Sequence, residues 1–146
     1  MKHVLVSALL SVIVFAAHGQ RSEIFAPDGK AIKGYDPVAF FNVSKAVPGS
    51  DSLAYEYKGA KWLFSSRENL TLFKASPDQY APQFGGYCAY GTAEGHKAPT
   101  ETDTWSIVEG KLYFNYNQKV KSLWVKDRPG LIKKANVNWP LLKDKE

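Results

Sequence analysis

The chain has 146 residues, with 19 Lys and Arg against 14 Asp and Glu and a formal net charge of +5. It is 45% hydrophobic and 14% aromatic, which is too apolar for a disordered chain and fits one ordinary domain. Its single cysteine excludes a disulfide scaffold and a structural zinc site built mainly from cysteines.

The first 19 residues have the pattern of a secretory signal peptide. A short basic start, Met1–His3, precedes the almost purely apolar run Val4–Ala17. That run of about 14 residues is shorter than the ~20 that span a bilayer, and small residues follow at the positions that a signal peptidase reads. We expect cleavage between Gly19 and Gln20 and no membrane span in the mature chain. The sequence therefore predicts a periplasmic or secreted protein whose domain covers residues 20–146.

Cleavage there removes most of the groups that could bind a soft metal. His3, His18 and the only Met leave with the signal peptide. The mature chain then holds one thiol, Cys88, and one imidazole, His96. Soft-metal or thiol chemistry would have to use these two side chains.

Charge is distributed unevenly along the chain. Residues 20–110 carry 9 basic and 11 acidic side chains, whereas residues 111–146 carry 9 basic and 3 acidic, a net charge of +6. A solvated lysine-rich face on the last helices explains this, and a weak contact with an anionic surface is the alternative. The basic residues do not alternate with exposed aromatics, so we expect no nucleic-acid partner.

Short strands are predicted in the first half of the chain. Val38–Phe41 and Ala54–Lys58 have the composition of strands. Lys58-Gly59-Ala60 indicates a turn, and the aromatic segment Trp62–Phe64 follows it. A hairpin is therefore expected here.

A helix is predicted next. Ser65 lies three residues before Glu68, which is the spacing of a capping box, and apolar residues follow on one face. We therefore expect a helix of about ten residues to begin there. Pro77 and Pro82 then predict a loop.

The second half reads as a hairpin and two helices. Residues 105–115 form the hairpin, with its turn at Glu109-Gly110. Asn117 is placed to cap one helix, and Pro129 fits the first turn of another that runs to about Ala135. Hairpins and helices without βαβ alternation predict a single α+β domain, with a small antiparallel sheet and three or more packed helices.

The glycine-rich stretch before Cys88 is the segment of the sequence that points most clearly to a functional site. Gly85 and Gly86 permit positive φ or a close approach of another segment. Cys88 would lie in the first turn of a short helix, where free N–H groups and the helix dipole favour a thiolate. The alternative is a buried, inert Cys88 packed among Tyr87, Tyr90 and Phe84.

His96 follows Cys88 by eight residues. On an unbroken helix the two would be roughly 12 Å apart, too far to share a metal. Gly91 or Gly95 could end the helix and fold His96 back, and an exposed loop position is the alternative. No orienting partner for a Cys–His pair is evident, so we expect a protein that is not an enzyme.

These motifs together resemble the YHS-domain family in its longer exported form. The likeness extends over nearly all of the mature chain in short pieces: Gly34–Ala39, Tyr57–Gly59, Trp62–Ser66, Phe73–Pro77, Tyr80–Ala89, Gly110–Tyr113 and Asn138–Pro140. The resemblance implies that a set of motif residues shapes a pocket or a partner surface: Tyr35, Asp36, Gly85, Gly86, Tyr87 and Tyr90.

The resemblance also implies metal handling. Shorter YHS modules are associated with heavy metals, including copper-transporting pumps, and offer cysteines where this chain has Ala39, Ser65 and Asn69. Cys88 is the remaining thiol. Binding of copper as Cu(I) between Cys88 and His96 is the most economical site, because soft ligands select Cu(I) and two can suffice. The alternative is a non-catalytic module that binds a small ligand or a partner, with Cys88 as a buried structural residue.

Overall fold

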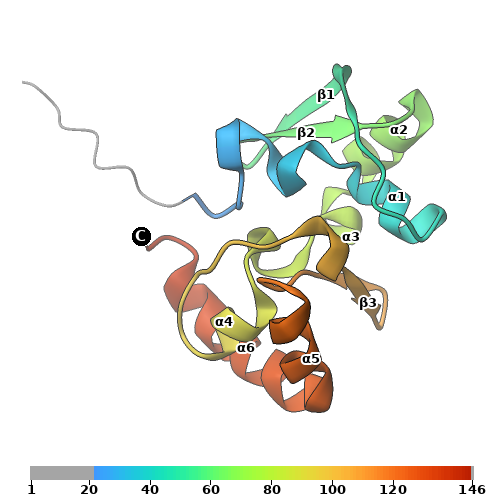
Figure 1. The fold of residues 1–146 in the computed structure, drawn as a ribbon. Helices are drawn as coiled ribbons and strands as arrows, with labels where there is room; N and C mark the ends of the chain where they lie inside the picture. Colours follow the sequence, from blue (N-terminus) through green and yellow to red (C-terminus); the bar gives the residue numbers. More distant parts are fainter. Residues whose placement is uncertain (1–21, 146) are drawn as a thin grey trace, which may run out of the picture.

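Two antiparallel hairpins and six helices form the part of the chain that the computed structural model describes, residues 22–145 (Figure 1). The strands are β1 (Ser50–Tyr57), β2 (Ala60–Phe64), β3 (Ser106–Val108) and β4 (Lys111–Tyr113). The helices are α1 (Pro37–Asn42), α2 (Arg67–Ala75), α3 (Pro77–Tyr80), α4 (Ala89–Ala93), α5 (Gln118–Lys126) and α6 (Arg128–Leu142). The α+β class is confirmed, although the hairpins form two separate two-stranded sheets.

The expected signal peptide, residues 1–19, lies outside the described residues. Within residues 22–145, no helix has both the length and the apolar character that crossing a membrane requires.

β1 and β2 form the hairpin that the sequence predicts. Tyr57 pairs with Ala60 across the turn. Lys58 and Gly59 both have positive φ, 50° and 74°, as a tight two-residue hairpin loop requires. β1 begins at Ser50, earlier than its composition indicates.

The segment Val38–Phe41 is helical, and the predicted strand is wrong. It lies in α1, whose N-cap is Asp36 and whose first residue is Pro37. The Asp36 carboxylate accepts the N–H groups of Val38 at 2.8 Å and Ala39 at 3.3 Å. A capping carboxylate followed by proline starts a helix here, and this local signal outweighs the strand preference of valine and phenylalanine.

Two boundaries near α2 also differ from the prediction. The N-cap of α2 is Ser66, which accepts the N–H of Asn69 at 3.1 Å, and not Ser65. The segment between Pro77 and Pro82, expected to be a loop, contains the single-turn helix α3. Proline at the first position of that turn has no N–H to leave unpaired.

The second half matches the prediction more closely. Val108 pairs with Lys111, which leaves Glu109-Gly110 as the turn of the β3–β4 hairpin. α5 begins directly after Asn117, whose side chain accepts the N–H of Val120 at 2.9 Å.

α6 is longer than the prediction. It begins after its N-cap Asp127 and continues well beyond Ala135, with Pro140 inside its last turn. Leu131 and Ala135 are buried, and Trp139 packs against the same cluster four residues further on. This apolar stripe keeps the helix on the core, and tertiary packing therefore sets its length.

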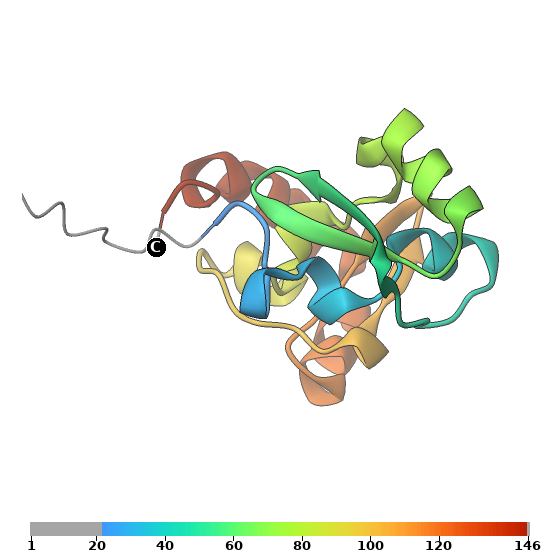
Figure 2. The same ribbon diagram turned by 90° about the horizontal axis from the view of Figure 1, so that it is seen from above.

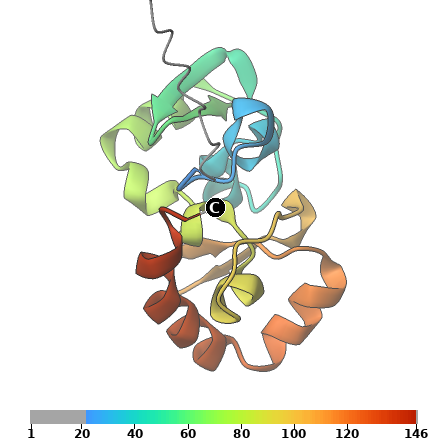
Figure 3. The ribbon, with the colours of Figure 1, turned by 90° about the vertical axis from the view of Figure 1, so that its left-hand side faces the viewer.

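Two hydrophobic clusters fill the two halves of the molecule that Figure 3 shows one above the other. Trp62 belongs to the first cluster and Trp124 to the second, and both are fully buried. The β4 segment joins them, since Leu112 and Phe114 enter the first cluster and Tyr113 the second. Successive strand residues point to opposite sides, which makes this division possible. Viewed from above, the β1–β2 hairpin lies in front (Figure 2).

Candidate functional site

Cys88 lies in the interior, directly before α4, and is 1% exposed. Its Sγ accepts the backbone N–H of Gly91 at 3.4 Å and that of Tyr116 at 3.3 Å. The thiol donates to Asn115 Oδ1 at 3.6 Å. The sulfur thus caps α4 and joins it to the chain after β4.

Burial raises the pKa of the Cys88 thiol, and this outweighs the lowering by the N–H groups of Gly91 and Tyr116. The thiol is therefore neutral near neutral pH. The sequence predicted a thiolate at this helix start, but the structure does not favour one. Burying a charged sulfur away from water costs more free energy than hydrogen bonds from the few N–H groups of this short helix regain.

His96 folds back onto α4, as the glycine spacing allows. Its N–H donates to the Gly91 carbonyl at 3.0 Å, and its Nε2 lies 3.2 Å from the position that a Cβ on Gly91 would occupy. His96 is exposed, whereas Cys88 is buried. Within residues 22–145, no group of three or more His, Cys, Asp or Glu side chains could hold a metal ion. The two residues do not form an open site that fits Cu(I).

The thiol of the native chain is expected to resist modification. Ellman's reagent should react with Cys88 at least about 100-fold more slowly than in the denatured chain, because access requires a local opening of several kcal/mol. Cys88 is the only cysteine, so one absorbance change reports it. The variant Cys88→Ser supplies the background. Rapid stoichiometric reaction of the folded protein would contradict the burial of this sulfur.

Asp36 is a fully buried carboxylate that several donors surround. Besides the two N–H groups at the start of α1, it accepts the N–H of Ser65 at 2.8 Å and its hydroxyl at 2.6 Å. The side-chain amide of Asn69 donates to the same oxygen, Oδ2, at 2.8 Å. Asp36 therefore joins α1 to β2 and α2. A buried charge with this many donors holds its neighbours in fixed positions.

This network includes the positions where metal-handling YHS modules are expected to carry cysteines. Ser65 and Asn69 donate their side-chain hydrogens to Asp36, and Ala39 is buried in α1. In this chain, the Asp36 carboxylate and its hydrogen-bond donors occupy the region where those modules would carry thiolates. The chain thus uses these positions to hold elements together.

Gly85 allows the N-terminal segment to pack closely. Its φ is +61°, and a Cβ at this position would lie 1.8 Å from the Glu23 carbonyl oxygen. The Gly85 carbonyl accepts the N–H of Phe25 at 2.8 Å. The missing side chain of Gly85, the first glycine of the motif, thus lets residues 22–26 pack closely against it.

The neighbours of Gly85 fix the same segment. Gly86 has φ +84°, and its carbonyl accepts the Thr100 hydroxyl at 2.7 Å. The Tyr87 hydroxyl donates to the Ser22 carbonyl at 2.8 Å. Gly86 and Tyr87 are both buried, so their main role is to hold these segments of the fold together.

The other two tyrosines among the candidate residues are half-buried. Tyr35 packs against the first hydrophobic cluster. Tyr90 packs against the second, and its N–H donates to Asn115 Oδ1 at 3.1 Å. The six motif residues are thus distributed over both halves of the molecule.

A cleft of about 230 Å³ lies where the two halves meet the N-terminal segment. One wall comes from the first half, with Tyr57, Lys58 and Asp78, and the other from α6, with Asn136 and Trp139. The chain from Ala81 to Gly85 forms its base together with Glu23, Ile24 and Pro140. Gly85 is therefore the one candidate motif residue that lines it.

Polar groups of the first wall and of the base pair with one another in this cleft. The Tyr57 hydroxyl donates to Asp78 at 2.7 Å, and Lys58 forms an ion pair with Glu23 at 3.0 Å. The pKa of Tyr57 is raised to about 12, mainly by burial of the phenol and secondly by its hydrogen bond to Asp78. The phenol consequently keeps its proton throughout the physiological range.

Sequence reasoning missed the cleft and also Lys97. The buried Lys97 ammonium donates to the carbonyls of Lys143 at 2.7 Å, Lys145 at 2.8 Å and Ser22 at 3.4 Å. It also lies 5.8 Å from the centre of the Trp139 ring. The sequence offered no signal for either feature, since the contributing residues are far apart along the chain.

The sequence profile of the YHS domain matches residues 39–84. Searches of curated proteins and of solved structures give no significant match. The matched segment runs from α1 to the residue before Gly85, and it contributes Tyr57, Lys58 and Asp78 to the cleft. The resemblance found in the sequence is confirmed there, and the chain carries a YHS domain at residues 39–84.

Proposed function

We propose that the chain is an exported, non-catalytic binding module that holds a small polar ligand in the cleft between its two halves. The observation that carries this proposal is the convergence of polar side chains from both walls beside the Trp139 ring. Binding sites combine an apolar surface with a few placed polar groups, and they favour junctions between structural units.

The lining groups favour a neutral ligand with several hydrogen-bonding groups. Lys58 and Glu23 form an ion pair and Asp78 accepts from Tyr57, so these charged groups already have partners within the chain. The amides of Gln83 and Asn136 make no hydrogen bond to another described residue, so both can bind a ligand. A volume of about 230 Å³ is smaller than the ~300 Å³ and above of drug-sized sites. A metabolite-sized polyol, sugar or amide fits this description.

A binding role also suits the remaining chemistry of the chain. The cleft is lined by no cysteine, histidine or serine among the described residues. Cys88 is buried in a separate part of the molecule and hydrogen-bonded to its neighbours. This favours Cys88 as a structural residue and a protein that binds without catalysis.

Thermal shift with a panel of monosaccharides, polyols and amino-acid amides tests the proposal. A ligand at 100 times its Kd should stabilise the native chain by about 2.7 kcal/mol. The double variant Gln83→Ala/Asn136→Ala should lose most of that shift. Gln79→Ala, which removes an exposed amide outside the cleft, should keep it. A shift equal in all three proteins, or none with any compound, would count against the cleft.

Binding of Cu(I) by Cys88 and His96 is the competing hypothesis, and a titration under reducing conditions separates the two. A competition assay with a chromogenic Cu(I) chelator measures the affinity of the native chain and of Cys88→Ser. We expect equal values, because the metal cannot reach a sulfur that is 1% exposed. Stoichiometric binding that Cys88→Ser or His96→Ala abolishes would favour metal handling instead.

A further inference from the structure

The two C-terminal helices expose apolar side chains to solvent. Six large hydrophobic side chains of the described residues are exposed, and four of them lie on α5 and α6. Val137 and Leu141 on α6 are 68% and 66% exposed, while Leu123 and Val125 on α5 are less so. Val137 and Leu141 are four residues apart and therefore lie on one face of α6.

The same helices carry a dense positive charge. Six basic residues, against Asp127 alone, belong to α5, α6 and the residue between them: Lys119, Lys121, Lys126, Arg128, Lys133 and Lys134. The ion pairs among residues 22–145 all involve lysines of the first half. Among the described residues, the basic groups of α5 and α6 therefore form no ion pair with a carboxylate.

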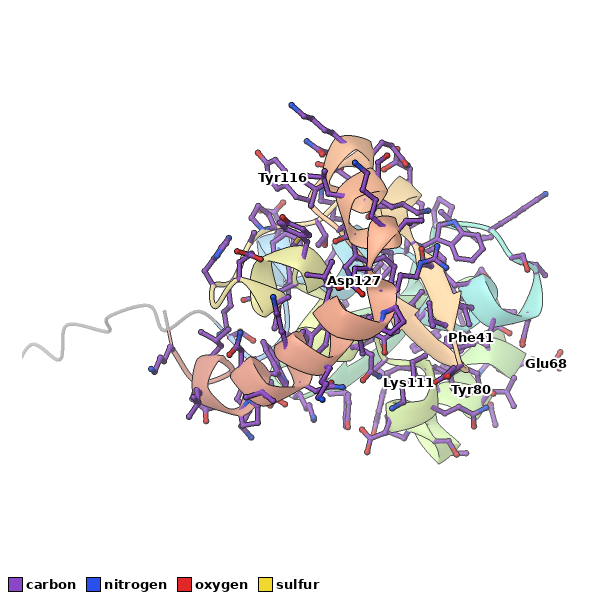
Figure 4. All side chains as sticks on the ribbon, turned by 90° about the horizontal axis from the view of Figure 1, so that it is seen from below. Phe41, Glu68, Tyr80, Lys111, Tyr116 and Asp127 are labelled. Carbon is purple, nitrogen blue, oxygen red and sulfur yellow. The ribbon has the colours of Figure 1, made fainter. Side chains whose placement is uncertain are left out.

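The apolar and basic side chains coincide on α6. Lys133 and Val137 together form a ridge, because both line two shallow grooves, one toward the β3–β4 turn and the other toward α4. The acidic groups at these grooves, Glu109 and Glu94, come from the facing elements. Figure 4, seen from below, shows α5 and α6 in front, with Asp127 between them.

We propose that this α5–α6 face binds an anionic lipid surface, with the lysines at the headgroups and Val137 and Leu141 inserted among them. An exposed helix that combines lysines with protruding apolar side chains has the composition of a membrane-surface helix. Lysine stems can extend along apolar material while their ammonium groups stay at the phosphates. The unneutralised positive charge complements an anionic membrane, and the ridge enters a soft surface without needing a preformed pocket. This proposal is independent of the cleft.

Vesicle co-sedimentation of the chain from Gln20 tests it, since every described contact lies within residues 22–145. The vesicles are phosphatidylcholine alone, or phosphatidylcholine with 30% phosphatidylglycerol. We expect binding to the anionic vesicles alone, weakened by added salt. Each lysine near an anionic surface contributes about fivefold to partitioning, so Lys133→Gln/Lys134→Gln should lower it by about 25-fold. Val137→Ser should lower it by about fivefold.

The matched control is Lys45→Gln/Lys74→Gln. This variant removes the same charge from two exposed lysines outside α5 and α6, so it should bind anionic vesicles nearly as well as the unmodified chain. Thermal unfolding checks that all variants fold, as substitutions of exposed side chains should allow. Three results would each overturn the proposal: no vesicle binding, equal binding to neutral vesicles, or equal losses in the control and in the α6 variant.

Discussion

Replacing Asp36 by Asn should lower the free energy of unfolding by about 3–5 kcal/mol. The carboxylate accepts five hydrogen bonds, from Val38, Ala39, Ser65 and Asn69. An amide of the same shape keeps one acceptor oxygen and places an NH₂ group against the other donors. At least two buried donors then lose their partner, and α1 is no longer held to β2 and α2. Urea denaturation measures the change.

Asp28→Asn is the matched control for this experiment. Asp28 is exposed and has φ +56°, a conformation that Asn tolerates well. Its stability should stay within about 0.5 kcal/mol of the original chain. If Asp36→Asn unfolds at the same urea concentration as Asp28→Asn, the Asp36 network does not stabilise the fold.

Gly85→Ala should be destabilising by about 2–4 kcal/mol, because it combines a strained backbone with a steric overlap. The added Cβ would lie 1.8 Å from the Glu23 carbonyl oxygen, and backbone atoms cannot move aside as a flexible side chain can. Residues 22–26 must then shift away. The Phe25 amide, which donates to the Gly85 carbonyl, should lose its protection from hydrogen exchange.

Gly29→Ala separates the two contributions. Gly29 has φ +77°, and nothing lies within 4 Å of an added Cβ. It therefore carries the backbone strain alone, about 1 kcal/mol. Equal losses for Gly29→Ala and Gly85→Ala would show that the close approach of Glu23 contributes nothing.

The parts of the fold that the sequence predicted depend on neighbouring residues. The turns at Lys58-Gly59 and Glu109-Gly110 and the cap at Asn117 are each read from a few adjacent residues, and all three are confirmed. The wrong prediction of a strand at α1 has a local cause too. Asp36 and Pro37 start a helix, but the valine and phenylalanines that follow have the composition of a strand.

The environment of Cys88 could not be read in the same way. Its burial depends on Asn115 and Tyr116, which lie more than 25 residues further along the chain. The cleft is lined by Glu23 at its base and by Tyr57 and Trp139 in its walls, which are also far apart in sequence. Such arrangements follow from how the two halves pack, and no local pattern encodes that packing.

The Lys97 ammonium has a consequence for how the molecule can be attached to something else. Because it holds carbonyls of Ser22, Lys143 and Lys145 together, the first and last described residues emerge side by side, as Figure 1 also shows. A tether or fusion partner joined directly at Ser22 or at Lys145 would leave from the same spot. Immobilising residues 22–145 through Ser22 or through Lys145 should therefore leave the same face toward the surrounding solution.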